Sequence, residues 1–162
     1  MNAPNIQRVQ QLALERCFEF VAPVVPLATF HGTLPLEPGG VLRDGEGRAV
    51  LLHTAPRRWL VPEPSTPLHE SLLELDRKGV GALVDVDGKW QFLGMQAENA
   101  IRILESSVNI SATLHTRSCA AVVLFDCPAV VARNGTTFDC WVKSSYAESL
   151  LGAIDKVTLC RI

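Results

Sequence analysis

The 162-residue sequence has few aromatic residues and no block of basic residues. Aromatic residues make up 6% of the chain and all hydrophobic residues 48%, so we expect a core built mainly from Val, Leu, Ala and Ile. The formal net charge is −2. Because nucleic-acid binding normally requires a basic face that displaces counterions, we expect no nucleic-acid partner.

The sequence also lacks a long uninterrupted hydrophobic run. Residues 18–30 are the most apolar early stretch, but Pro23 and Pro26 interrupt them and the run is too short to span a bilayer. The first residues, MNAPNIQRVQQ, are polar and carry no apolar segment of the kind that secretory signals contain. These features predict a cytoplasmic protein with no membrane partner.

Common catalytic motifs are missing from the sequence. It contains no GxGxxG, GxxxxGK[ST], HExxH or GxSxG pattern, and we therefore predict no catalytic residue. The five cysteines include no CxxC pair, and the four histidines have no ligand-like spacing, so we expect free thiols and no metal site. Cys119, Cys127 and Cys140 are expected in the sheet region, where they could cluster.

The stretch from Arg117 to Asp155 carries the clearest structural signal. Asn134-Gly135 separates two β-rich runs, 129–133 and 136–143, and this dipeptide is typical of a hairpin turn. Ser145 and Glu148 then have the spacing of a capping box, which predicts a helix over 146–155.

The remaining elements predict an α+β fold. We expect strands at 49–53 and 58–61, a helix at 66–78, a second hairpin of 82–86 with 89–93 at Asp87-Gly88, and a helix at 97–107. From Arg58 onward this order matches a ferredoxin-like split βαβ, with an antiparallel sheet and helices on one face.

The first quarter of the chain is expected to differ from the rest. Ile6, Val9, Leu12 and Leu14 have near-helical spacing, and residues 31–48 are rich in Pro and Gly. We therefore divide the chain into residues 1–48, an N-terminal helix and connection, and residues 49–162, the α+β domain.

Several residues are candidates for a functional role. Asp85 lies in the apolar run ALVDV, either as a buried carboxylate that binds a ligand or as an outward strand position. Arg57, Arg58 and Trp59 suit an anion site or a protein interface, or else Trp59 packs in the core. Trp141 falls on the polar face of its strand, which indicates either a second packed layer or a subunit contact.

Tyr146, at the expected helix start, is either a hydrogen-bonding group at an interface or a core residue. With Arg57, Arg58, Trp59 and Trp141 it completes the set of candidate partner contacts.

The order of these motifs resembles the gamma subunits of heterotetrameric sarcosine oxidases. Residues 82–111, ALVDVDGKWQFLGMQAENAIRILESSVNIS, are similar to the family's strand, turn and helix, and residues 115–147 to its Thr-Arg strand, apolar strand, glycine turn and Ser-Tyr-Ala segment. Residues 55–61, APRRWLV, resemble the Pro-x-x-Trp-Leu strand shared with the aminomethyltransferase superfamily. The resemblance covers about residues 48–155.

This resemblance implies a fold related to the folate-binding domain of the glycine cleavage T-protein. It also implies a non-catalytic accessory subunit that binds no cofactor itself, within a complex whose larger subunits carry flavin, NAD, folate and zinc. Such complexes oxidise N-methyl amines such as sarcosine in one-carbon metabolism.

Two alternatives remain open at the level of sequence. In the first alternative, the chain is a free-standing folate or pterin binder or a one-carbon transferase. Asp85 and Arg133 are then the available carboxylate and arginine. Otherwise it is a structural homo-oligomer with Trp141 at a symmetric contact.

Overall fold

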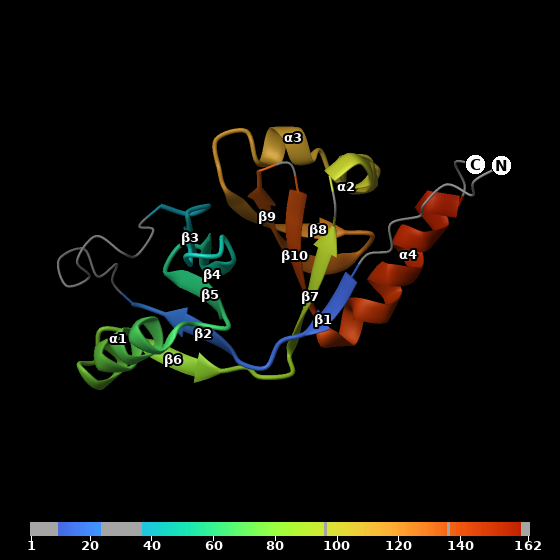
Figure 1. The fold of residues 1–162 in the computed structure, drawn as a ribbon. Helices are drawn as coiled ribbons and strands as arrows, with labels where there is room; N and C mark the ends of the chain where they lie inside the picture. Colours follow the sequence, from blue (N-terminus) through green and yellow to red (C-terminus); the bar gives the residue numbers. More distant parts are fainter. Residues whose placement is uncertain (1–9, 24–36, 96, 136, 160–162) are drawn as a thin grey trace.

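The computed structural model describes residues 10–23, 37–95, 97–135 and 137–159, which fold into two five-stranded antiparallel sheets (Figure 1). The first sheet has the order β1-β7-β10-β9-β8 and the second the order β3-β4-β5-β2-β6. The strands are β1 (Gln10–Ala13), β2 (Cys17–Val21), β3 (Val41–Arg43), β4 (Ala49–Ala55), β5 (Arg58–Pro62), β6 (Ala82–Asp85), β7 (Trp90–Met95), β8 (Cys119–Leu124), β9 (Cys127–Asn134) and β10 (Thr137–Lys143). The predicted α+β class with antiparallel pairing is confirmed.

Three helices cover the outer face of the first sheet: α2 (Ala97–Glu105), α3 (Ile110–Thr113) and α4 (Ala147–Leu159) (Figure 1). One hydrophobic cluster joins them to the strands, with Leu104, Ile110 and Leu150 packed with Val131 and Cys140. Burial of these aliphatic side chains, at about 25 cal/mol per Å² of apolar surface, holds the helices on the sheet.

Helix α1 (Thr66–Arg77) covers the outer face of the second sheet. Its apolar stripe packs with Phe20 and Trp59, which are fully buried. The helix begins with a proline in its first turn and is followed by Gly79 at φ 68°, as the sequence predicts.

The inner faces of the two sheets pack against each other. Their shared cluster contains Leu52 and Leu60 from the second sheet and Trp90, Val130 and Trp141 from the first. The chain is therefore layered as helices, sheet, sheet and helix.

The predicted hairpin at Asp87-Gly88 is wrong. Strand β6 pairs with β2, whereas β7 pairs with β1 and β10, so the turn carries the chain from one sheet to the other. The predicted single sheet is therefore two sheets. Strands β5 and β6 belong to the second sheet, which α1 covers, and β7 belongs to the first sheet, which α2 covers. The turn chemistry is local, but the partners of both strands come from distant parts of the chain, β2 for β6 and both β1 and β10 for β7.

The helix predicted near the N-terminus is also wrong for the residues that the structure describes. Residues from Gln10 onward form β1 and β2, while Ile6 and Val9 lie outside the described ranges. Strand β2 is the more important, because it lies between β5 and β6 and buries Phe18 and Phe20. Phe18 and Phe20 alternate with Glu19 in this strand, but the near-helical spacing of Leu12 and Leu14 just before it favoured a helix. The proposed boundary at residue 48 remains a prediction.

The hairpin of β9 with β10 is confirmed, with Asn134 paired to Thr137. The capping box expected at Ser145 and Glu148 is replaced by a 3₁₀ turn, Ser144–Tyr146, whose N-cap is Lys143. The Ser144 hydroxyl donates to the Gly88 carbonyl oxygen at 2.6 Å, which ties this helix start to the turn between the sheets. Within the described ranges, no helix combines the length and apolar character needed to cross a membrane.

Candidate functional site

In the part of the chain that the structure describes, two grooves open along the contact between the sheets. The groove named here the acidic groove has a volume of about 350 Å³, and its lining combines apolar residues and Asn134 with four carboxylates and one arginine: Glu15, Glu46, Glu63, Asp139 and Arg48. The groove named here the basic groove has a volume of about 460 Å³, and its lining includes Arg58 and Lys143. Both volumes lie in the range of small-ligand or peptide sites.

Asp139 connects the acidic groove to the inner structure. Arg43 donates to the Asp139 carboxylate at 3.3 Å and to the Arg133 carbonyl oxygen at 2.7 Å, and Asn134 approaches the same carboxylate at 3.4 Å. Burial raises the pKa of Asp139 above its ordinary value, although the hydrogen bond and charge of Arg43 act in the opposite direction. This arrangement holds the edge strand β3 against the centre of the first sheet.

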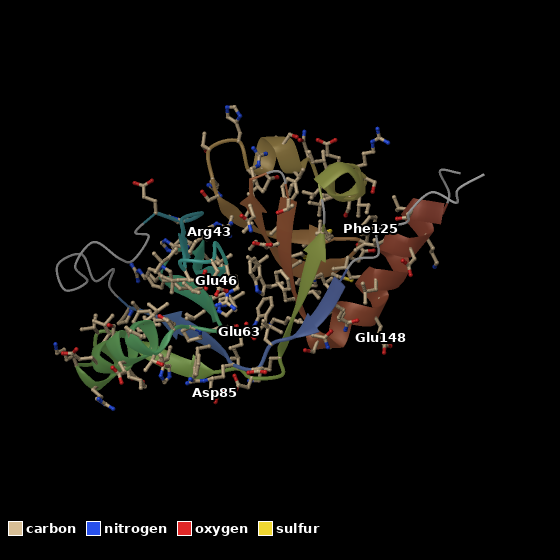
Figure 2. All side chains as sticks on the ribbon, viewed as in Figure 1. Arg43, Glu46, Glu63, Asp85, Phe125 and Glu148 are labelled. Atoms are coloured by element: carbon tan, nitrogen blue, oxygen red, sulfur yellow. The ribbon has the colours of Figure 1, made fainter. Side chains whose placement is uncertain are left out.

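The other carboxylates of the acidic groove lie closer to solvent. Arg48 forms ion pairs with Asp44 at 2.8 Å and with Glu46 at 3.4 Å. Burial acts to raise the pKa of Asp44, but its hydrogen bonds with Arg48 outweigh this effect and lower the pKa. Glu63 accepts the backbone N–H of Glu15 at 3.2 Å. Figure 2 shows Glu46 and Glu63 on the part of the second sheet nearest the first. The groove therefore carries more negative than positive charge.

Trp141 lines the acidic groove from the first sheet. Its side chain is 2% exposed and packs against Phe92 with ring centroids 5.5 Å apart. Among the described residues its indole N–H finds no acceptor, which is uncommon for a buried donor.

The basic groove is lined mainly by apolar groups from β5, β8 and β9. The Trp90 indole N–H donates to the Glu19 carboxylate at 3.2 Å, and the Lys143 ammonium lies 5.4 Å from the Trp90 ring centroid. A lysine in this position gains from the negative face of the indole ring. Glu19 thus has a neutral partner, and its charge is not paired with Arg58 or Lys143 at salt-bridge distance.

Charged and apolar side chains make up most of both linings. The side chains that line the two grooves include no Ser, Cys or His, and Thr54 lines the basic groove. Within the described ranges, no three His, Cys, Asp or Glu residues gather in a way that could hold a metal ion. Charged groups and apolar walls are the features that these grooves offer.

The structure does not bring the folate candidates together. Asp85 is an exposed residue on the edge strand β6 and accepts the Asp87 backbone N–H at 2.9 Å (Figure 2). Arg133 lies on β9 of the other sheet, with its guanidinium 5.8 Å from the Phe138 ring centroid. Neither residue lines the acidic or the basic groove.

The candidate partner contacts divide into buried and exposed groups. Trp59 is fully buried and stacks on His53 with ring centroids 4.4 Å apart, so it is a core residue and not part of an exposed interface. Trp141 is likewise buried, because the second sheet supplies the second packed layer that its position indicated. Arg57, Arg58 and Tyr146 are exposed.

Cys119, Cys127 and Cys140 do not form one cluster. Cys127 and Cys140 pack on the helix-covered side of the first sheet, whereas Cys119 belongs to the cluster between the sheets. The Cys119 thiol lies 3.7 Å from the His53 carbonyl oxygen and serves as a weak donor.

Sequence reasoning missed Arg43, Glu63 and Lys143. Each occurs beside ordinary turn or strand residues, and its role depends on pairing between distant segments. The alternation of Phe138, Cys140 and Val142 does place Lys143 on the opposite face of its strand, with Trp141, but it does not show which distant residues Lys143 meets there.

Comparison with known proteins gives a likeness of fold. No family model matches the chain, and no curated protein matches it significantly. Among solved structures, it is similar to a chain of the heterotetrameric sarcosine oxidase from Corynebacterium sp. U-96, determined in complex with pyrrole 2-carboxylate. The TM-score is 0.73 at 20% sequence identity, over 93% of this chain and 83% of the other. The two chains therefore share an overall fold.

Proposed function

We propose that this chain is a non-catalytic, gamma-type accessory subunit of a heterotetrameric sarcosine oxidase-like complex that oxidises amines in one-carbon metabolism. The observation that carries this proposal is the fold likeness, which extends over 93% of this chain and 83% of the other. The resemblance of residues 48–155 to the gamma subunits supports the same assignment from sequence.

The thiols of Cys17, Cys119 and Cys140 lie in hydrophobic clusters, and burial raises their pKa values to about 12, which supports packing roles for these residues. In this proposal the larger subunits carry flavin, NAD, folate and zinc, and this chain stabilises their assembly in the cytoplasm. The relation to the folate-binding T-protein fold is part of the same proposal.

The experiment that tests this role removes the chain from its own host. We expect loss of the gene to reduce oxidation of an N-methyl amine such as sarcosine, because the remaining subunits assemble poorly. Re-expression of the chain restores the activity, whereas the purified chain alone is colourless and oxidises no amine. Undiminished sarcosine oxidation in the deletion strain would argue against the accessory role.

A second measurement separates assembly from catalysis. Size-exclusion chromatography of the deletion extract should show the flavin absorbance in smaller species than in the wild type. A flavin-bearing species of unchanged mass, with activity lost, would instead indicate a catalytic contribution from this chain.

A further inference from the structure

Strand β8 is an edge of the first sheet and pairs with β9 alone. The Cys119 N–H donates to the Gly39 carbonyl oxygen at 2.9 Å, so this amide points away from β9. Because hydrogen-bonding directions alternate along an antiparallel strand, the N–H and C=O groups of Ala121 and Val123 also point away from β9. Among the described residues, no backbone group outside β9 bonds to either of them.

The residue opposite Val123 agrees with this alternation. Pro128 faces Val123 across the ladder and has no N–H to donate, which fits a pair that is not hydrogen-bonded. The main-chain groups beyond Cys119 are therefore available to another extended segment.

The sequence of β8 does not protect this edge. The strand reads CAAVVL, without the charges or prolines that commonly prevent pairing at sheet edges. Val123 is 58% exposed, and Ala121 and Val123 both line the basic groove. An apolar side chain of an added strand would find an apolar wall there.

The charge of the groove defines the segment that fits it. Arg58 and Lys143 both line the groove, and neither has a carboxylate within 4.0 Å among the described residues. Glu19, in the same groove, accepts the Trp90 indole N–H. An incoming carboxylate would therefore meet two cations without a local ionic partner.

We propose that β8 and the basic groove receive an extended segment of a partner protein, which adds a strand at Ala121–Val123 and places an Asp or Glu near Arg58 and Lys143. The mode is β-strand addition, in which main-chain hydrogen bonds give affinity and side-chain pockets give specificity. This inference names the docking surface of the proposed accessory subunit and so rests on that function for the partner's identity. The geometry of the edge and groove is independent of it.

Two occupants from this chain fit the charge less well. Residues 24–36, VVPLATFHGTLPL, contain no Asp or Glu, and neither does the β8 strand of a second copy. Neither segment would supply the carboxylate from within its own strand.

Site-specific photo-crosslinking tests the proposal in the full chain. A tagged chain with p-benzoylphenylalanine in place of Val123 is expressed in its own host, irradiated, and the adduct is mapped by mass spectrometry. The same substitution of Val84, an exposed valine on the edge strand β6, is the matched control. We expect a peptide with an Asp or Glu, from another protein, at position 123 and not at position 84.

The alternative adducts overturn the proposal. One such adduct is a crosslink to residues 24–36, and another is a crosslink to β8 of a second copy. The absence of any adduct, both at position 123 and at the second site, Ala121, overturns the proposal as well. If the crosslinked protein belongs to no flavin-bearing complex, the docking surface stands while the proposed function fails.

Charge reversal provides an independent arm. Arg58→Glu should lower the partner's affinity by about tenfold or more, because it places like charges together. Arg77→Glu, on the exposed end of α1, makes the same charge change away from the groove and should leave the affinity within about twofold. Equal binding by the Arg58→Glu variant, with an unchanged melting temperature, would overturn the proposal.

Discussion

Arg43 of β3 donates to Asp139 of β10 at 3.3 Å, and the two residues are 96 positions apart. The pair joins the edge of the second sheet to a central strand of the first. Their side chains are 24% and 13% exposed, so this contact is shielded from solvent much more than a surface ion pair.

Arg43→Met is expected to lower the free energy of unfolding by about 1–3 kcal/mol at neutral pH. The substitution keeps most of the aliphatic stem but leaves the half-buried Asp139 carboxylate and the Arg133 carbonyl oxygen without their donor. Urea denaturation measures the loss. Arg77→Met, at an exposed position, serves as the control and should change stability by less than about 0.5 kcal/mol.

Asp139 should also impose a pH dependence on stability. Because burial raises its pKa in the folded state, the folded protein keeps this proton to higher pH than the unfolded chain. The free energy of unfolding therefore falls as pH rises from about 4 through the raised pKa and is level above it. Asp139→Asn should remove this slope, and Arg43→Met should extend the upper end of the window to higher pH, because Arg43 lowers the pKa of Asp139 in the folded state.

NMR titration of the Asp139 carboxyl carbon gives the same information directly. A pKa below the ordinary carboxyl value would show that the charge of Arg43 outweighs burial. The expected slope would then have the opposite sign.

Gly81→Ala should destabilise the second sheet. A Cβ at this position would lie 2.4 Å from Cζ of Phe20 and 2.9 Å from the Val21 carbonyl oxygen, and Phe20 is fully buried. We expect a loss of about 1–3 kcal/mol in the free energy of unfolding. Gly152→Ala on helix α4 is the control, because the added Cβ meets nothing within 4 Å. This substitution should raise the free energy of unfolding by about 0.5–1 kcal/mol.

Thermal melting of the two glycine variants compares the effects on one scale. If Gly81→Ala melts with or above the wild type, the close approach of Phe20 to this backbone is not maintained in solution.

Three thiols should be protected in the folded protein. Burial raises the pKa values of Cys17, Cys119 and Cys140 to about 12, and the reactive thiolate is scarce at pH 8. Iodoacetamide labelling followed by peptide mass spectrometry should find these residues unmodified in buffer. In urea all five cysteines of the chain should be alkylated. Rapid labelling of Cys140 in buffer would contradict the packing of α4 on the first sheet.

Two features determined by neighbouring residues agree with the sequence prediction. Asn134-Gly135 lies between two strands that pair with each other, so its turn chemistry and its tertiary role agree. The stop at Gly79 is likewise local, because a positive φ at the end of α1 depends on the residue at that position.

Features that depend on distant pairing were not predicted. Asp87-Gly88 is a turn with Gly88 at φ 71°, but its flanking strands pair with other strands: β6 with β2, and β7 with β1 and β10. The hairpin of β8 with β9 turns at Phe125 and Asp126, both at positive φ, without the glycine or asparagine that would reveal it. The basic groove combines β5 with β8 and β10, so its cations could not be grouped from sequence spacing.

The central claim is that this chain belongs to an amine-oxidising complex, and native mass spectrometry of the chain recovered from its own host tests it most directly. A tagged full-length chain should be recovered at fixed stoichiometry with larger subunits, and the assembly should show flavin absorbance. Recovery of a colourless monomer or homo-oligomer at low ionic strength would contradict the claim.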